Sequence, residues 1–135
     1  MKKLFSIDDD PVVMACLKRV LKTEGFEVEG STDPDEGLAI LRTRTDLALL
    51  LLDVKIPKKG GFEVYMELRE FSEIPVLFVT AYPPTFDAHN DEVVQMWQAR
   101  FADGTTDIIY KPFDVNILFE KVEGLVGSAN DEVPA

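Results

Sequence analysis

The hydrophobic positions of the chain follow two alternating patterns, one typical of strands and one typical of helices. In 47–52 every residue is apolar, as expected for a central strand of a parallel sheet that is buried on both faces. In 26–29, Phe26 and Val28 alternate with Glu27 and Glu29, which indicates a half-buried strand. We predict five strands in all, at 4–7, 26–29, 47–52, 75–79 and 108–110.

Apolar residues at helical spacing separate these strands. We predict helices at 11–24, from 33 onward, and at 62–71, 91–102 and 115–125. Pro11 suits a first helical turn, an acidic residue before it can cap the helix, and Gly25 suits a helix end. Cys16 lies on the apolar stripe of the first helix, so we expect it in the core. Gly37, inside the second helix, costs about 1 kcal/mol relative to alanine and is expected to allow close packing.

The order of elements is a strand followed by a helix, repeated five times. This alternation predicts an α/β fold: one doubly wound, five-stranded parallel sheet with helices on both faces. We expect one domain over residues 1–127 and a polar tail or linker stub over 128–135. Ligands bind at the carboxyl ends of the strands in such sheets, so the residues there are the candidates for function.

Composition narrows the class of protein. The 135 residues include 14 Lys and Arg against 25 Asp and Glu, a net charge of −11. This balance argues against a large nucleic-acid footprint, because phosphate groups are bound by Lys and Arg. The single cysteine excludes an internal disulfide, and no apolar run approaches the length of a membrane span. No signal-peptide pattern follows Lys2 and Lys3, so we expect a cytoplasmic protein.

Four of the five predicted strands end in reactive polar groups. These are Asp8 and Asp9, Asp53, Thr80, and Lys111. Taken singly, each has a simple structural explanation, since aspartate forms turns and threonine suits strands. Turn chemistry does not readily explain the whole set, which should meet at one edge of the sheet.

Three carboxylates held close together repel one another, and a divalent cation would remove this repulsion. Oxygen ligands without clustered Cys or His favour Mg²⁺ or Ca²⁺, and open positions for a phosphate oxygen favour Mg²⁺. Lys111 would supply a point charge for a phosphoryl group, and Thr80 a hydrogen bond to one of its oxygens. The predicted chemistry is phosphoryl transfer to a carboxylate.

The motifs stand in a fixed order along the chain: Asp8-Asp9-x-Pro11, Asp53 with Pro57 and Gly61 beyond it, Thr80-Ala81, and Lys111-Pro112-Phe113. Together they resemble the receiver domain of bacterial two-component response regulators, over about residues 2–126. The resemblance implies the flavodoxin-like strand order 2-1-3-4-5. It also implies a switch rather than an enzyme, one that assists its own phosphorylation and dephosphorylation.

The resemblance further implies a role for each acidic residue. Asp53 would accept a phosphoryl group from the phosphohistidine of a partner kinase. Asp9 and Asp53 would hold Mg²⁺ directly, with Asp8 acting mainly through water. The backbone carbonyl of Lys55 would complete the protein ligands.

The remaining two site residues would respond to the phosphoryl group. Lys111 would pair with Asp53 and then with the phosphoryl group, and Thr80 would move toward a phosphoryl oxygen. The peptide bond between Lys111 and Pro112 would be cis. The implied partners are a sensor histidine kinase or phosphotransfer protein and a downstream output protein or domain. Phosphorylation-dependent dimerisation stays open, and neither direct nucleic-acid binding by this domain nor membrane contact is expected.

The sequence departs from the family pattern in two places. The family often has an aromatic residue three positions before the active-site lysine, where this chain has Ile108; Tyr110 follows on the same face of the strand. The segment from Thr80 to Gly104 is also longer than usual by about two helical turns, which predicts an added loop at 83–90.

Three other functions compete with this one. A phosphatase of the haloacid-dehalogenase type needs a second aspartate two residues after the nucleophile, where this chain has Lys55. A flavin mononucleotide carrier needs a phosphate cradle after the first strand, where three aspartates would repel phosphate. A receiver-like interaction module that does not depend on phosphate stays open because of Ile108. Beside the site, Lys58 and Lys59 could attract an acidic partner or simply form a solvated loop.

Overall fold

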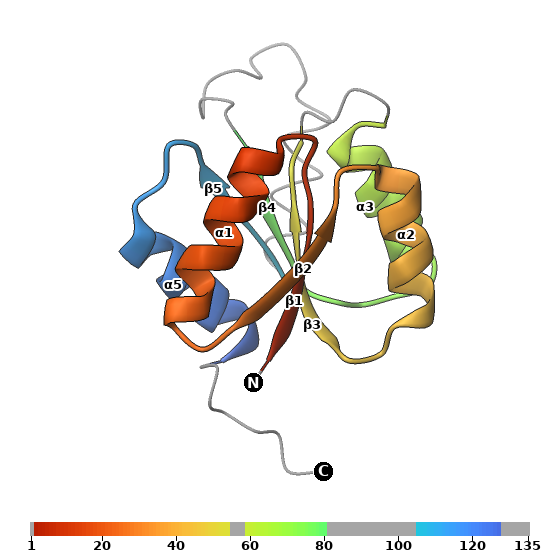
Figure 1. Ribbon diagram of the computed structural model, residues 1–135. Coiled ribbons are helices and arrows are strands. Elements are labelled where there is room, and N and C mark those ends of the chain that lie inside the picture. The colour runs from red at the N-terminus through yellow and green to blue at the C-terminus, as the bar shows by residue number, and fades with distance from the viewer. Residues whose placement is uncertain (1, 55–58, 81–104, 128–135) are drawn as a thin grey trace.

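The five strands form one parallel sheet in the order β2-β1-β3-β4-β5, which confirms the predicted fold (Figure 1). The computed structural model describes residues 2–54, 59–80 and 105–127, and for Thr80 the backbone alone. Its elements are β1 (Lys3–Ile7), α1 (Pro11–Thr23), β2 (Glu27–Ser31), α2 (Pro34–Thr43), β3 (Leu47–Leu52), α3 (Gly61–Arg69), β4 (Val76–Thr80), β5 (Thr106–Tyr110) and α5 (Val115–Val126). The predicted loop at 83–90, helix at 91–102 and tail at 128–135 lie outside the described residues.

Short-range hydrogen bonds explain where the helices begin. Asp10, Asp33 and Asp114 precede α1, α2 and α5, and each side chain accepts a hydrogen bond from the backbone N–H two residues further on. The predicted acidic cap before Pro11 is therefore Asp10. After α1 the chain turns at Gly25, whose φ of 90° lies in the left-handed region that favours glycine.

Two apolar layers cover the sheet, with α1 and α5 on one face and α2 and α3 on the other (Figure 1). In β3 the residues alternate between them: Leu49 and Leu51 pack toward α1 and α5, and Leu50 and Leu52 pack toward α2 and α3. All four are almost completely buried. The continuous apolar run of 47–52 therefore reflects a strand covered on both sides, as predicted.

Gly37 lies where α2 crosses β1. A Cβ atom at this position would lie 2.6 Å from Cδ1 of Ile7, a fully buried side chain. The expectation that this glycine allows close packing is confirmed.

The prediction that Cys16 lies in the core is wrong, because its side chain is exposed. The buried side chains of α1 are Met14, Leu17 and Leu21, spaced three and four residues apart. This spacing puts Cys16 on the outer side of the helix, where Val12 is also 74% exposed. Among the described residues, no helix combines the length and apolar character that crossing a membrane requires.

Candidate functional site

Two aspartates leave the centre of the sheet side by side. Ile7 and Leu52 are paired in the register of β1 and β3, and the backbone N–H of Asp53 donates to the carbonyl of Ile7 at 3.0 Å. Asp8 and Asp53 are therefore the next residues on two adjacent strands. They are 1% and 5% exposed, which is unusual for carboxylates that are not paired or bound to a cation.

Asp9 completes a cluster of three carboxylates at this edge. Asp8, Asp9 and Asp53 each offer an oxygen, and these oxygens all lie within 4.8 Å of one another. Asp9 is exposed, unlike the other two, so the cluster opens to solvent on its side. The expected convergence of the three aspartates at one edge of the sheet is present in the structure.

Lys111 reaches the same cluster from the end of β5. Its Nζ lies 3.1 Å from Oδ2 of Asp8 and 3.8 Å from Oδ2 of Asp53. The ion pair with Asp53 that the resemblance implied is therefore present, and the closer contact, a hydrogen bond, is to Asp8. The peptide bond between Lys111 and Pro112 is cis, as the resemblance implied.

The backbone around the acids is tightly constrained. The N–H of Asp10 donates to Oδ1 of Asp8 at 2.9 Å, which leaves Oδ2 facing Lys111. The N–H of Gly61 donates to the carbonyl of Val54 at 3.0 Å. A Cβ atom on Gly61 would lie 2.5 Å from the carbonyl oxygen of Asp53, so glycine is required for this close approach. Gly61, at the start of α3, is therefore held against the chain just after β3.

The cluster suits a small divalent cation. Among the described residues, three carboxylates against one ammonium group leave an excess of negative charge in a partly buried place, which is unfavourable without a cation. Mg²⁺ takes oxygen ligands at roughly 2.1 Å, so two oxygens bound to one ion lie about 3–4 Å apart. The carboxylate oxygens, all within 4.8 Å of one another, are close enough to share one such ion. Lys55, whose carbonyl was expected as a further ligand, lies outside the described residues, as does Pro57.

The ends of β4 and β5 lie in register next to this cluster. Thr80 is paired with Tyr110, and Phe78 with Ile108. Ile108 packs into the apolar layer under α2 and α3. Tyr110 is half-buried, and its burial raises the pKa of the phenol. The aromatic residue of β5 is thus the register partner of Thr80, two residue pairs beyond Ile108.

Lys59 is a residue whose contacts the sequence did not reveal. It forms ion pairs with Asp35 on α2, at 2.8 Å, and with Glu67 on α3, at 2.6 Å. Its side chain is 20% exposed, so neither a solvated loop nor a free attractive charge describes it. The pair with Glu67 spans eight residues and the pair with Asp35 joins separate elements, so helical or strand periodicity gave no signal for them. Lys58 lies outside the described residues.

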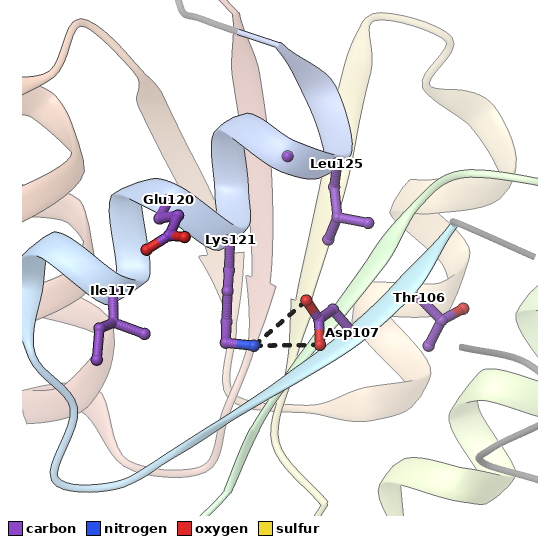
Figure 2. A pocket seen from close by; sticks show the side chains of 7 residues that line it. Thr106, Asp107, Ile117, Glu120, Lys121 and Leu125 are labelled. Carbon is purple, nitrogen blue, oxygen red and sulfur yellow. Dashed lines mark hydrogen bonds and ion pairs between the residues drawn. The ribbon is translucent and has the colours of Figure 1, made fainter. Parts of the chain in front are cut away.

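A cavity of about 560 Å³ lies elsewhere, between β5 and α5 (Figure 2). Lys121 and Asp107 face one another across it, with both Asp107 oxygens 3.3 Å from Nζ. Ile117 and Leu125 give the lining its apolar part. None of the acidic cluster lines this cavity, so it is separate from the site at the strand ends.

The whole arrangement defines a receiver domain. The chain matches the family model of the response regulator receiver domain over residues 4–123, and it belongs to this family. The solved response regulator TrrA of Thermotoga maritima, in complex with Mg²⁺ and BeF, is 28% identical with a TM-score of 0.74, covering 93% of this chain and 99% of that one. A receiver domain protein from Clostridium thermocellum, 21% identical with a TM-score of 0.75 and covering 93% and 94%, supports the fold alone.

Two curated relatives are longer proteins of the same family. The chain is 33% identical over 126 residues to the transcriptional regulatory protein CpxR of Klebsiella pneumoniae, covering 93% of this chain and 50% of that protein. It is 31% identical over 137 residues to the DNA-binding dual master transcriptional regulator RpaA of Synechocystis, covering 99% and 52%. The chain therefore spans about half the length of these relatives.

Proposed function

We propose that this receiver domain accepts a phosphoryl group from the phosphohistidine of a sensor histidine kinase or phosphotransfer protein onto Asp53, in a reaction that depends on Mg²⁺. The observation that carries the proposal is the position of Asp53. It is a buried carboxylate within 4.8 Å of the oxygens of two others and 3.8 Å from a lysine ammonium group. This surrounding suits a phosphoacceptor, because a lysine and a bound cation can stabilise both its own negative charge and that of the incoming phosphoryl group.

The chemistry is an in-line displacement at phosphorus. A carboxylate oxygen of Asp53 forms the new P–O bond, the P–N bond to the donor histidine breaks, and its electron pair returns to the imidazole. Asp9 and Asp53 would hold Mg²⁺ directly, and the backbone carbonyl of Lys55 would be a further ligand. Asp8 would act on the ion mainly through water. The ion would neutralise the charge that gathers on the phosphoryl oxygens.

Lys111 and Thr80 would act on the product. The ammonium group of Lys111 already lies between Asp8 and Asp53, so a small movement would bring it to a phosphoryl oxygen. Thr80 ends β4 beside this edge and would donate a hydrogen bond to another phosphoryl oxygen. A movement of Thr80 would reach Tyr110, its partner in register, and so reach β5. This is how the domain would signal to its output.

The proposal names partners by their chemistry. A histidine kinase or phosphotransfer protein supplies the phosphoryl group, and an output protein or domain reads the change. CpxR and RpaA are named as transcriptional regulators, and we propose that any DNA contact of that kind is made outside this receiver domain, because its net charge is −11. Phosphorylation-dependent dimerisation and a cytoplasmic location remain predictions from the sequence.

Incubation with acetyl phosphate and Mg²⁺ tests the proposal. We expect a hydroxylamine-labile phosphoryl adduct that disappears in Asp53→Asn and when EDTA replaces Mg²⁺. Asp107→Asn is the matched control, because Asp107 is an aspartate at the separate cavity and should leave the adduct intact. If the folded wild-type protein forms no adduct, the phosphate-independent interaction module becomes the better explanation.

A further inference from the structure

Lys59, just before α3, forms ion pairs with both α2 and α3. Its Nζ contacts Oδ1 of Asp35 in the first turn of α2 and Oε2 of Glu67 in α3. The carboxylates are 50% and 41% exposed, and the lysine side chain only 20%. The two carboxylates raise the pKa of Lys59, with the contact to Asp35 as the larger cause. The ammonium group of Lys59 is therefore fixed by two ion pairs instead of being free in solvent.

Lys59 lies two residues before Gly61, which contacts the backbone of Asp53, the proposed phosphoacceptor. Gly61, two residues on, donates its N–H to Val54 and lies directly against the carbonyl of Asp53. A shift of the backbone at Lys59 would pass through Gly60 to Gly61, and from there to the main chain of Asp53. The N-cap residue of α3 is Gly60, which has no side chain to accept a capping hydrogen bond. The position of the first turn of α3 therefore depends on contacts of the neighbouring residues.

We propose that Lys59 is a positioning residue for phosphoryl transfer: by binding Asp35 and Glu67, it holds Gly61 against Asp53 and fixes the acceptor carboxylate. The inference rests on the proposed function. Transfer reactions are sensitive to small displacements of the reacting atoms, so a loosened contact at Gly61 should slow phosphorylation of Asp53.

A simple charge effect makes a different prediction. Removal of Lys59 makes this side of the domain more negative, whereas neutralisation of Asp35 and Glu67 makes it more positive. If only the field mattered, these changes would alter the reaction with the anionic donor acetyl phosphate in opposite directions. If Lys59 acts by position, both changes break the same clamp and both slow the reaction.

The variants follow from this contrast. Lys59→Met and the double variant Asp35→Asn/Glu67→Gln each remove the clamp, with opposite changes of charge. Lys59→Arg keeps a cation within reach of both carboxylates and should retain most of the wild-type rate. Lys121→Met is the matched control, because Lys121 is also part-buried and paired with a carboxylate, but at the separate cavity.

Two readouts decide the matter. Both clamp-breaking variants should slow phosphorylation by acetyl phosphate and Mg²⁺ about threefold or more, measured well below the unfolding temperature. Independently, amide hydrogen exchange of Gly61, followed by NMR without donor, should become about threefold or more faster in both variants and stay unchanged in Lys121→Met.

Rates that move in opposite directions in the two variants, or Gly61 exchange that stays at the wild-type value, would overturn the positioning role. If the wild-type protein takes up no phosphoryl group, the proposed function fails, and Gly61 exchange alone decides whether the clamp exists.

Discussion

At the scale of single residues, the ammonium group of Lys111 holds two of the three acids together. Lys111 contacts both Asp8 and Asp53, and all three side chains are mostly buried. The strand ends allowed these residues to be predicted from sequence, because the carboxyl ends of parallel strands meet. The contacts of Lys59 could not be predicted, since they depend on side chains from three separate elements. Cys16 was misplaced because apolar residues occupy more than one side of α1.

Removal of the Lys111 ammonium group should take away a positive partner from two buried carboxylates, those of Asp8 and Asp53. We predict that Lys111→Met lowers the free energy of unfolding by about 2 kcal/mol in the absence of Mg²⁺, because the loss of one partner from a buried pair is costly. Lys121→Met removes a more exposed pair and should cost under about 1 kcal/mol. Urea unfolding of both variants measures the difference, and equal losses would show that Lys111 has no special electrostatic role.

At the scale of elements, glycines inside helices distinguish close packing from intrinsic helix preference. Gly37→Ala gains helix propensity but drives a Cβ atom to within 2.6 Å of Ile7 in β1. For Gly124 in α5, no described atom beyond the local backbone of the helix lies within 4 Å of the place that a Cβ atom would take, so alanine fits there. The two positions look alike in sequence, and only the packing of α2 on the sheet separates them.

We predict opposite effects for these two substitutions. Gly37→Ala should destabilise the protein by about 1 kcal/mol, because overpacking outweighs the gain in helix propensity. Gly124→Ala should stabilise it by about 0.5–1 kcal/mol. Thermal and urea unfolding of both variants give the comparison, and a stabilised Gly37→Ala variant would show that Ile7 moves aside at little cost.

A cluster of ion pairs around Arg44 links the end of α2 to β2 and to the start of β3. Arg44 forms paired hydrogen bonds with Glu29 in β2 and with Asp46 just before β3, at 2.6–3.1 Å. These contacts hold the pKa of Glu29 below its ordinary value and the pKa of Asp46 far below, chiefly through hydrogen bonds from Arg44. A lowered folded-state pKa contributes stability above the unfolded-state pKa and loses it as the pH falls.

The cluster therefore predicts a pH dependence. The stability advantage of the wild type over Arg44→Met should be complete at pH 7 and should shrink as the pH falls below about 4, where the carboxylates of the unfolded chain take up protons. Arg19→Met removes the same charge from the exposed face of α1 and serves as the control. Urea unfolding at pH 7 and pH 3 provides the test. A difference between wild type and Arg44→Met that grows on acidification contradicts the account.

At the scale of the whole molecule, the sheet order brings together residues that are far apart in sequence. β1 and β3 are neighbours at the centre, which places Asp8 beside Asp53 across 45 residues of chain, and β5 brings Lys111 to them. The strand and helix pattern predicted a parallel sheet with the site at the carboxyl ends of its strands, and the family resemblance implied the strand order. The additional, shorter contact of Lys111 with Asp8 was not predicted, because it depends on the side-chain geometry after the strands have ended.

The most direct test of the account identifies the residue that carries the phosphoryl group. Borohydride reduction of the protein after reaction with acetyl phosphate and Mg²⁺ converts a phosphorylated aspartate to homoserine, which peptide mass spectrometry locates. We predict homoserine at position 53 alone, and none when Mg²⁺ is removed. Homoserine at position 8 or 9, or at 53 without any need for Mg²⁺, would contradict the claim that these acids form one cation-dependent site with Asp53 as the acceptor.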